Sequence, residues 1–222
     1  MGTPAQGYRL NNGDRVPGTT TVISNCKIGG IEGLLYWANQ EGLNGRNYKD
    51  TRDKAADAGT CAHDMVECDI REKDFDKSKY PPEILNLAEG AFKAYQKWAK
   101  HTKLKAVSPE TRLVSETYRY GGTLDAMLVD GELALGDWKT SNSVRADYLI
   151  QLAAYRQLWE ENNPDRLVTG GFHLLKFSKP EHPDDPVHFS HHHWSHLDIA
   201  WEAFKHMREL YDLSSRLKKL AS

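Results

Sequence analysis

Cysteine and long apolar runs are both scarce in this 222-residue sequence. Its three cysteines are an odd number without C-x-x-C spacing, so neither a disulfide framework nor a zinc ribbon is favoured, and we expect reduced thiols. The apolar runs fall far short of the ~20 residues of a membrane span, and the first residues lack the apolar segment of a secretory signal. A cytoplasmic protein without a membrane partner is expected.

A strong net charge is missing as well. Lysine and arginine number 29 against 31 aspartates and glutamates, which gives a formal net charge of −2 at pH 7. A polyanionic partner would therefore have to be met by a local basic patch or by bound cations. The hydrophobic fraction of 39% and the charged fraction of 27% are ordinary for a globular chain. The length fits one domain, predicted over residues 1–222.

The first half of the chain is rich in helical signals. An extended pair followed by a turn is expected within residues 8–24, around "NNGD", and a polar link is expected at 73–82. Apolar residues at helical spacing predict helices over residues 31–42, 48–71 and 82–102. Residues 1–105 are thus expected to form a helical N-terminal part.

Beyond residue 105 the pattern changes to strands, in a predicted sheet core with a C-terminal helix over residues 106–222. Gly-Gly and Asp-Gly turns separate three segments of an antiparallel meander, predicted over residues 111–120, 121–130 and 132–140. A helix over 145–162, strands over 166–178 and 186–194, and a helix over 196–220 follow. The expected fold class is a mixed α/β (α+β) domain with a central mixed sheet flanked by helices.

Two neighbouring strands of this meander carry acids near their ends. Asp125 lies in "GGTLDAM" and Asp137 in "GDWKT", and the Asp130–Gly131 turn would bring the two carboxylates together. Close like charges repel unless a proton or a cation lies between them, and Mg²⁺ is commonly held by one or two carboxylates. A lone D-x-K sequence is typical of a surface ion pair. The second acid makes a metal site an equal alternative.

Lys139 shares the strand face of Asp137. It could orient or deprotonate a metal-bound water, or stabilise charge on phosphorus. Upstream, His63 and Glu67 stand at i and i+4 on one helical face. Glu116 is placed on the first strand of the meander, where it could point to the same end of the sheet.

Five segments resemble, in their order, the PD-(D/E)XK nuclease superfamily in its RecB-like branch, which includes phage exonucleases and CRISPR-associated nucleases. They are "GTCAHDMVE", "SE", "GGTLDAML", "LALGDWKTS" and "QLAAYRQL". The opening "GYRLNNGDRVPGTTTVIS" and "LLYWANQEGLNG" are similar to the start of phage-encoded members. The resemblance implies a restriction-endonuclease-like sheet.

The resemblance also implies a set of metal ligands: His63, Asp125, Asp137 and the backbone carbonyl of Trp138. One or two Mg²⁺ or Mn²⁺ ions would bind there, and Lys139, matching the catalytic lysine, would lie at the attacked phosphate instead of pairing with Asp137. Glu116 matches an acidic position of the first core strand. Gln151 and Tyr155, which are i and i+4 on the helix after Lys139, match a Q-x-x-x-Y motif acting near the lysine and the DNA. The four-cysteine set of many relatives is missing, so no iron–sulfur cluster is expected.

Other residues could contact DNA, with ordinary packing or solvation as the alternative. A basic patch could come from Lys93, Lys97, Lys100, Lys103 and Lys105, and bases could stack on Tyr118, Tyr120 or Tyr148. A histidine cluster comprises His188, His191, His192, His193 and His196. It could bind zinc, but it lacks an acidic or cysteine frame, so a strand-end loop is expected.

The expected function is a divalent-metal-dependent DNA exonuclease that serves phage or prophage recombination, replication or repair in the cytoplasm of a bacterial host. Linear single- or double-stranded DNA ends are the expected substrate, with a recombination or single-strand-binding protein as a possible partner and an oligomer as a possible state. Two alternatives stay open: a structure-specific endonuclease, and a catalytically silent DNA-binding module on the same fold.

Overall fold

The N-terminal part of the chain is mainly helical. The structure, a computed structural model, describes residues 7–26, 28, 31–177 and 188–221. A small hairpin of β1 (Tyr8–Arg9) and β2 (Arg15–Val16) comes first. It is followed by α1 (Thr19–Cys26), α2 (Glu32–Leu43), α3 (Tyr48–Ile70), the 3-10 turn η1 (Lys77–Lys79) and α4 (Pro82–His101). The three predicted helices are confirmed.

Helix α1 is the element that the sequence pattern missed, because residues 19–24 were expected to be extended or turn. Its sequence "TTTVISNC" is rich in β-branched residues, which are weak helix formers. Val22 and Ile23 are buried in a cluster with residues of α5 and α6, so tertiary packing decides the conformation here.

Five strands form a mixed sheet in the described part of the second half, in the order β3-β4-β5-β6-β7. They are β3 (Lys105–Ser115), β4 (Tyr120–Asp130), β5 (Glu132–Thr140), β6 (Phe172–Phe177) and β7 (Phe189–Trp194). The first three form the predicted antiparallel meander. Helix α5 (Ala146–Asn162) crosses over so that β6 runs parallel to β5, and β7 returns antiparallel. Helix α6 (Asp198–Leu220) follows; of the two predicted final strands, residues 178 and 186–187 lie outside the described residues.

The predicted Gly-Gly turn is wrong. The chain turns at residues 116–119, closed by Arg119 in the left-handed region (φ 55°), and both glycines lie inside β4. A Cβ on Gly121 would lie 2.2 Å from the Tyr8 ring, and one on Gly122 would lie 2.7 Å from the Tyr155 ring. These glycines therefore let the hairpin and α5 approach the sheet closely. The Asp130–Gly131 turn between β4 and β5 is confirmed.

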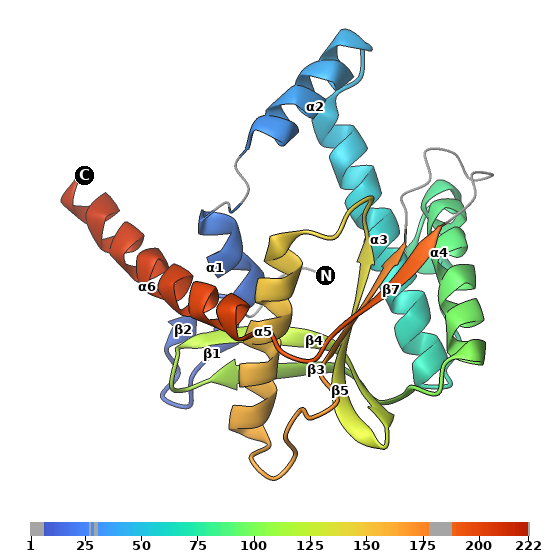
Figure 1. Cartoon of the computed structure of the whole chain (residues 1–222). Helices are drawn as coiled ribbons and strands as arrows, with labels where there is room; N and C mark the ends of the chain where they lie inside the picture. The colour runs from blue at the N-terminus through green and yellow to red at the C-terminus, as the bar shows by residue number, and fades with distance from the viewer. Residues whose placement is uncertain (1–6, 27, 29–30, 178–187, 222) are drawn as a thin grey trace.

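Helices cover both faces of the sheet (Figure 1). Helices α1, α5 and α6 pack on one face over a core that includes Tyr120, Leu158 and Phe204. Helices α3 and α4 pack on the other over Trp98 and Trp138. The predicted fold class, a mixed sheet flanked by helices with added N-terminal helices, is confirmed.

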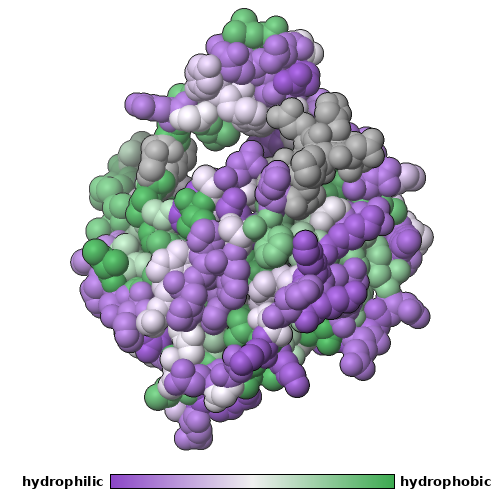
Figure 2. Space-filling model, turned by 45° about the vertical axis from the view of Figure 1, so that its right-hand side comes forward, coloured by the Kyte–Doolittle hydropathy of each residue, from purple (hydrophilic) through white to green (hydrophobic). Residues whose placement is uncertain are grey.

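Helix α2 stands apart from this body (Figure 1). Its helical spacing of apolar residues does not mark a buried face, since Leu34 and Leu35 are 56% and 59% exposed. The space-filling view shows an opening between the top of the molecule, where α2 lies, and the body (Figure 2). None of the helices in the described ranges is long and apolar enough to cross a membrane.

Candidate active site

The site forms where β4 and β5 stop pairing. Their ladder runs from Asp130–Glu132 to Ala126–Gly136 and ends there. One residue further along, a side chain replaces the backbone carbonyl as hydrogen-bond acceptor: Asp125 Oδ2 accepts a hydrogen bond from the backbone N–H of Trp138 at 2.9 Å. Asp125 thus lies within β4, and not near its end as expected, and a side-chain hydrogen bond joins its carboxyl group to that of Asp137.

Both carboxyl groups are withdrawn from water. Asp137 is fully buried and Asp125 is 6% exposed. Burial raises the pKa of Asp137 to about 7; the Lys139 charge opposes this shift and the Asp125 charge adds to it. Burial likewise raises the pKa of Asp125, against the Lys139 charge and the Trp138 N–H. Two such groups close together need a proton or a positive charge nearby.

Lys139 supplies one positive charge. Its Nζ lies 2.7 Å from Asp137 Oδ2, so the expectation that Lys139 is not paired with Asp137 is wrong for this structure. Residues two apart on a strand share a face, and the ammonium offsets a buried carboxylate. Burial alone would lower the pKa of Lys139, but the charges of Asp137 and Asp125 outweigh it and raise the pKa. Lys139 therefore stays an ammonium, which suits charge stabilisation better than proton abstraction.

His63 reaches the same place from α3. Its Nδ1 lies 3.6 Å from Asp125 Oδ2, and the ring also makes a hydrogen bond to the backbone of Trp138. Burial and the Lys139 charge lower the pKa of His63 to about 3, so the imidazole is neutral, as a metal ligand must be. Among the described atoms, His63 Nδ1 and Asp137 Oδ2 are buried without a well-formed hydrogen bond.

The types of donor atom at this site suit a divalent cation, but their arrangement in this structure does not. Two carboxylates and an imidazole are suitable ligands for Mg²⁺ or Mn²⁺. Among the described atoms His63 Nδ1 has no hydrogen-bond partner, whereas Asp137 Oδ2 faces the Lys139 ammonium at 2.7 Å. In the described ranges, however, no three His, Cys, Asp or Glu side chains are already grouped to hold a metal. The Lys139–Asp137 ion pair occupies one carboxylate, so binding would require this pair to open.

The Q-x-x-x-Y residues lie on the buried face of α5. Gln151 Nε2 donates to Tyr155 Oη at 2.6 Å. Burial raises the pKa of Tyr155 well above its usual value, and the charges of Asp125 and Asp137 add to this shift. Tyr155 is therefore a neutral phenol within electrostatic range of the carboxylates.

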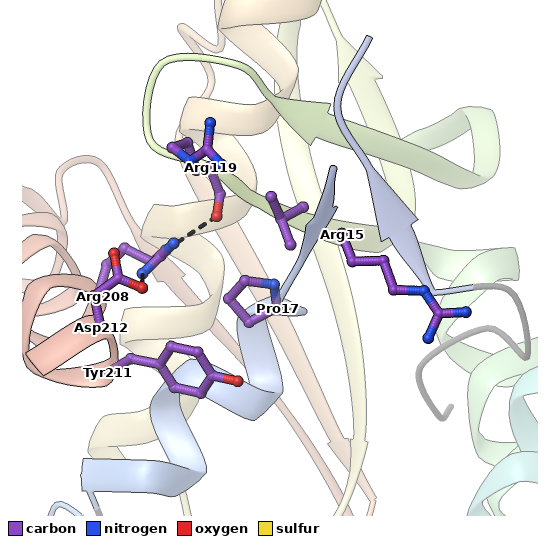
Figure 3. Close-up of a pocket in the computed structure, with 7 residues that line it drawn as sticks. Arg15, Pro17, Arg119, Arg208, Tyr211 and Asp212 are labelled. Carbon is purple, nitrogen blue, oxygen red and sulfur yellow. Dashed lines mark hydrogen bonds and ion pairs between the residues drawn. The ribbon is translucent and has the colours of Figure 1, made fainter. Parts of the chain in front are cut away.

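A pocket of about 430 Å³ lies elsewhere, between β2, the β3–β4 turn and α6 (Figure 3). Two of its lining arginines are engaged by the protein: Arg208 Nε donates to the Arg119 carbonyl and its Nη1 lies 2.6 Å from Asp212, while Arg119 pairs with Asp14 at 3.2 Å. This pocket contains none of the predicted site residues.

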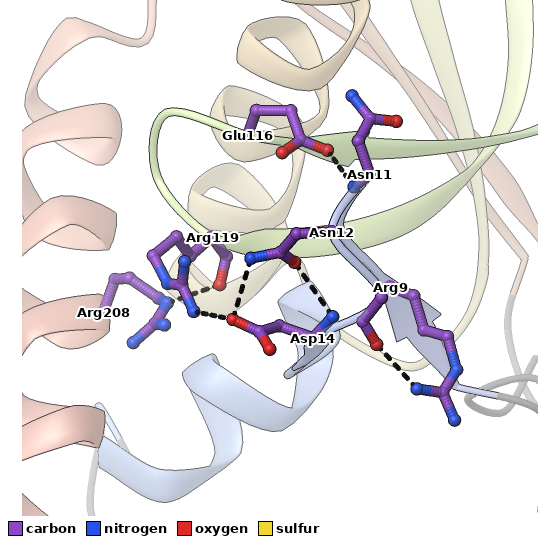
Figure 4. Close-up of polar contacts among 8 residues, drawn as sticks. Arg9, Asn11, Asn12, Asp14, Glu116, Arg119 and Arg208 are labelled. Carbon is purple, nitrogen blue, oxygen red and sulfur yellow. Dashed lines mark hydrogen bonds and ion pairs between the residues drawn. The ribbon is translucent and has the colours of Figure 1, made fainter.

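Glu116 does not reach the site. It lies in the turn after β3, is exposed, and accepts a hydrogen bond from the backbone N–H of Asn11 in the hairpin (Figure 4). Its predicted place on the first strand is wrong because that strand ends at Ser115, before the turn.

The acid that the sequence reasoning missed is Glu110, on β3. The register pairs Thr111 with Leu124, which sets Glu110 beside Asp125. Burial, a hydrogen bond to Glu67 and nearby acids raise the pKa of Glu110, and the pKa of Glu67 is lowered by the same hydrogen bond. Had the sequence pattern shown that the strand begins at residue 105, its register with β4 would have placed Glu110 opposite Asp125.

The predicted DNA contacts divide into core and surface residues. Tyr120 is fully buried and donates to the Ala154 carbonyl, so its ring is not open to stacking. Tyr118 is half-buried and packs edge-on against Trp201. Tyr148 lies under the Lys139 ammonium, 5.6 Å from ring centroid to Nζ, and is half-buried. The five lysines on and after α4 are exposed, and their role stays a prediction.

Three of the five clustered histidines, His191, His192 and His193, lie on β7 and not in a loop, whereas His188 and His196 lie just outside the strand. His191 and His193 lie on β7 and flank His173 of β6, with His173 Nδ1 2.8 Å from His191 Nε2. Trp98 Nε1 donates to His191 Nδ1. Within the described residues these rings form a packed ladder without a metal-binding arrangement.

Comparisons with known proteins give only distant likenesses. No family model and no curated protein matches. One solved structure is that of a protein from Eubacterium rectale named "putative exonuclease", with TM-score 0.46 and 12% identity over 69% of this chain and 64% of that one, so less than two thirds of its length is covered. Another, SSO0001, has TM-score 0.31 and 14% identity over 70% and 72%. At these TM-scores the likeness carries no weight for activity.

Proposed function

We propose that the chain is a divalent-metal-dependent deoxyribonuclease that acts on linear DNA as an exonuclease. The observation that carries the proposal is the convergence of Asp125, Asp137, Lys139 and His63 where β4 and β5 separate. Buried carboxylates that cannot both ionise without a cation are the usual surroundings of a metal that serves phosphate chemistry. The phage or prophage setting and the Mg²⁺ or Mn²⁺ requirement rest on the sequence resemblance.

Asp125, Asp137, His63 and the Trp138 carbonyl would hold the cation. When bound, it would polarise the phosphodiester and lower the pKa of water. Asp125 is oriented by the Trp138 N–H, and burial keeps bulk water from screening its charge. Asp137 holds Lys139 in its charged form, so that the ammonium can stabilise the negative charge that grows on the attacked phosphate.

Gln151 and Tyr155 form the wall of the site on α5. Their hydrogen bond fixes both side chains, and the phenol of Tyr155 has a proton to donate. We propose that this pair positions the DNA strand or the attacking water. A positioning error of 1 Å can lower the rate by about 10²-fold, so these two side chains would affect the cleavage rate even if they took no part in proton transfer.

Cleavage of end-labelled DNA tests the proposal. Linear single- and double-stranded DNA and covalently closed circles would be incubated with Mg²⁺, Mn²⁺ or a chelator. An exonuclease degrades the linear DNA only with metal and leaves the circles intact. Cut circles would assign an endonuclease instead, and DNA binding without cleavage under any metal would assign a silent binding module.

A further inference from the structure

The N-terminal hairpin carries two arginines in an unfavourable pairing. Arg9 and Arg15 are direct cross-strand partners of β1 and β2. Residues opposite one another in an antiparallel pair lie on the same face, and like charges in this position repel. Two strands of two residues each offer little to offset that cost. An anion between the two guanidinium groups would convert the repulsion into attraction.

Within the described part of the chain, no carboxylate forms an ion pair with Arg9 or Arg15. Arg9 Nη1 donates to the Gly13 carbonyl, which is neutral. Within the described residues, the Arg15 side chain has no ion pair or hydrogen bond. Arg15 in Figure 3 and Arg9 in Figure 4 reach out from the hairpin, away from the ion pairs of Arg119 and Arg208. The nearest acid of the hairpin, Asp14, is engaged by Arg119 at 3.2 Å.

A third arginine lies beside the hairpin on β3. Arg112 donates to the Gly7 carbonyl, and its guanidinium carbon lies 5.0 Å from the centre of the Tyr8 ring. Within the described residues, its partners are the neutral Gly7 carbonyl and the Tyr8 ring. All three arginines are exposed and belong to the hairpin or to the strand beside it, in a chain whose net charge is −2. Arginine is the residue best suited to phosphate, because its planar group can donate two parallel hydrogen bonds.

The hairpin is tied to the candidate active site. Tyr8 Oη is 3.0 Å from Thr123 Oγ1, and Thr123 pairs with Arg112 across β3 and β4. Thr123 precedes Asp125 by two residues, which is roughly 7 Å along a strand. Phosphates of a DNA strand repeat roughly every 3.4 Å of helix rise. A strand whose scissile phosphate reached Asp125 would therefore bring a phosphate a few nucleotides away to the arginines.

We propose that Arg9, Arg15 and Arg112 form a phosphate-binding cluster that holds the DNA backbone a few nucleotides from the cleaved bond. This inference rests on the proposed nuclease function and adds the surface that holds the substrate. The α4 lysines stay a separate prediction for a basic patch. The contacts are to phosphates, so they hold DNA without regard to sequence.

The test measures DNA affinity of the full-length chain in a chelator, by fluorescence anisotropy of a labelled linear duplex over a range of salt. Arg9→Gln/Arg15→Gln should weaken binding roughly tenfold, and the slope of log affinity against log salt should fall by about 1 for each arginine that binds a phosphate in the wild type. The matched control is Lys77→Gln/Lys79→Gln, which makes the same charge change at two exposed positions of η1 outside the proposed cluster and should bind as the wild type does.

Thermal melting separates binding from folding. Removal of a repulsive pair should leave the melting temperature of Arg9→Gln/Arg15→Gln equal or higher, whereas a structural role would lower it. The proposed cluster would be wrong if both double variants lost DNA affinity equally, or if the arginine variant lost none. Cleavage of DNA by the wild type would in that case still support the proposed nuclease function. If inorganic phosphate at matched ionic strength stabilised the wild type but the arginine variant kept its DNA affinity, the site would bind free phosphate, and the DNA proposal would be wrong. A wild type that neither bound nor cleaved DNA would overturn both proposals.

Discussion

Lys139 Nζ lies 2.7 Å from Asp137 Oδ2, inside the protein and beside the carboxyl group of Asp125. The ammonium and a divalent cation would therefore compete for the same carboxylate. The Lys139 ammonium thus offsets the charge of the buried acids.

Replacing Lys139 by Met should destabilise the fold and abolish cleavage. The change leaves Asp137 buried without its partner, which costs about 3–5 kcal/mol for a buried pair. The Lys139 charge lowers the pKa of Asp137 to its value of about 7, so this pKa should rise further in Lys139→Met and the carboxyl should take up a proton above pH 7. The loss of stability should therefore be largest at alkaline pH and shrink as the pH falls toward about 7. Urea unfolding at several pH values measures this.

The double variant Lys139→Met/Asp137→Asn controls for the charge. It carries no buried carboxylate at position 137, so it should recover much of the stability while remaining inactive. A Lys139→Met protein as stable as the wild type at pH 8 would show that the ion pair contributes nothing to the fold.

Glu110 and Glu116 give a direct comparison of two candidate acids. Glu110→Gln alters the carboxyl pair with Glu67 beside Asp125, so the cleavage rate should fall by at least about tenfold. Glu116→Gln removes an exposed acid from the β3–β4 turn and should leave the rate unchanged. Initial rates on one linear duplex measure both, and the reverse ranking would restore Glu116 to the site.

Gly122 should tolerate no side chain. A Cβ there would lie 2.7 Å from both Tyr155 Cε1 and Leu158 Cδ1, so Gly122→Ala must displace α5. Overpacking of this kind costs about 1–3 kcal/mol and should also disturb the Gln151–Tyr155 hydrogen bond, which would lower the cleavage rate. Gly42→Ala, in an open position on α2, is the control and should not lower the melting temperature. Equal stability of the two variants would contradict the close approach of α5 to β4.

His173 should make the protein sensitive to acid. Burial and the neighbouring His191 and His193 lower its pKa to about 4, whereas an unfolded histidine titrates near ~6.5. Between these two pH values the unfolded state binds more protons, so stability falls as the pH falls through this window. His173→Phe removes the titration and should lose less stability between pH 7 and 4 than the wild type, as measured by urea unfolding. An unchanged acid response in His173→Phe would mean that other groups set it.

Much of the site could be predicted because it depends on short-range spacing. Asp125 and Asp137 come from two strands joined by a tight turn, so their convergence follows from the hairpin alone. The i, i+4 spacing of Gln151 and Tyr155 likewise places the two side chains on one helix face, where they form a hydrogen bond. The meander and the parallel β6 follow from strand lengths and from the helix between them.

Other features depend on contacts that spacing does not reveal. The start of β3 at Lys105 depends on pairing with β4, and without that register Glu110 could not be distinguished from Glu116. Gly121 and Gly122 have the appearance of a turn in the sequence, and only the rings of Tyr8 and Tyr155 explain them as strand residues. The D-x-K spacing left an ion pair of Lys139 with Asp137 as one of two alternatives, but it did not reveal that this pair is buried beside a second carboxyl group.

Cleavage of a linear duplex in Mn²⁺ by the wild type, Asp137→Asn and the control Asp130→Asn tests the central claim most directly. Asp130 closes the β4–β5 turn outside the site, so its variant makes the same chemical change without touching the buried carboxyls. The wild type and Asp130→Asn should cleave with Mn²⁺ and not with a chelator, and Asp137→Asn should be slower by about 10³-fold or more while remaining folded. A folded Asp137→Asn protein that cleaved at the wild-type rate would contradict the assignment of this site.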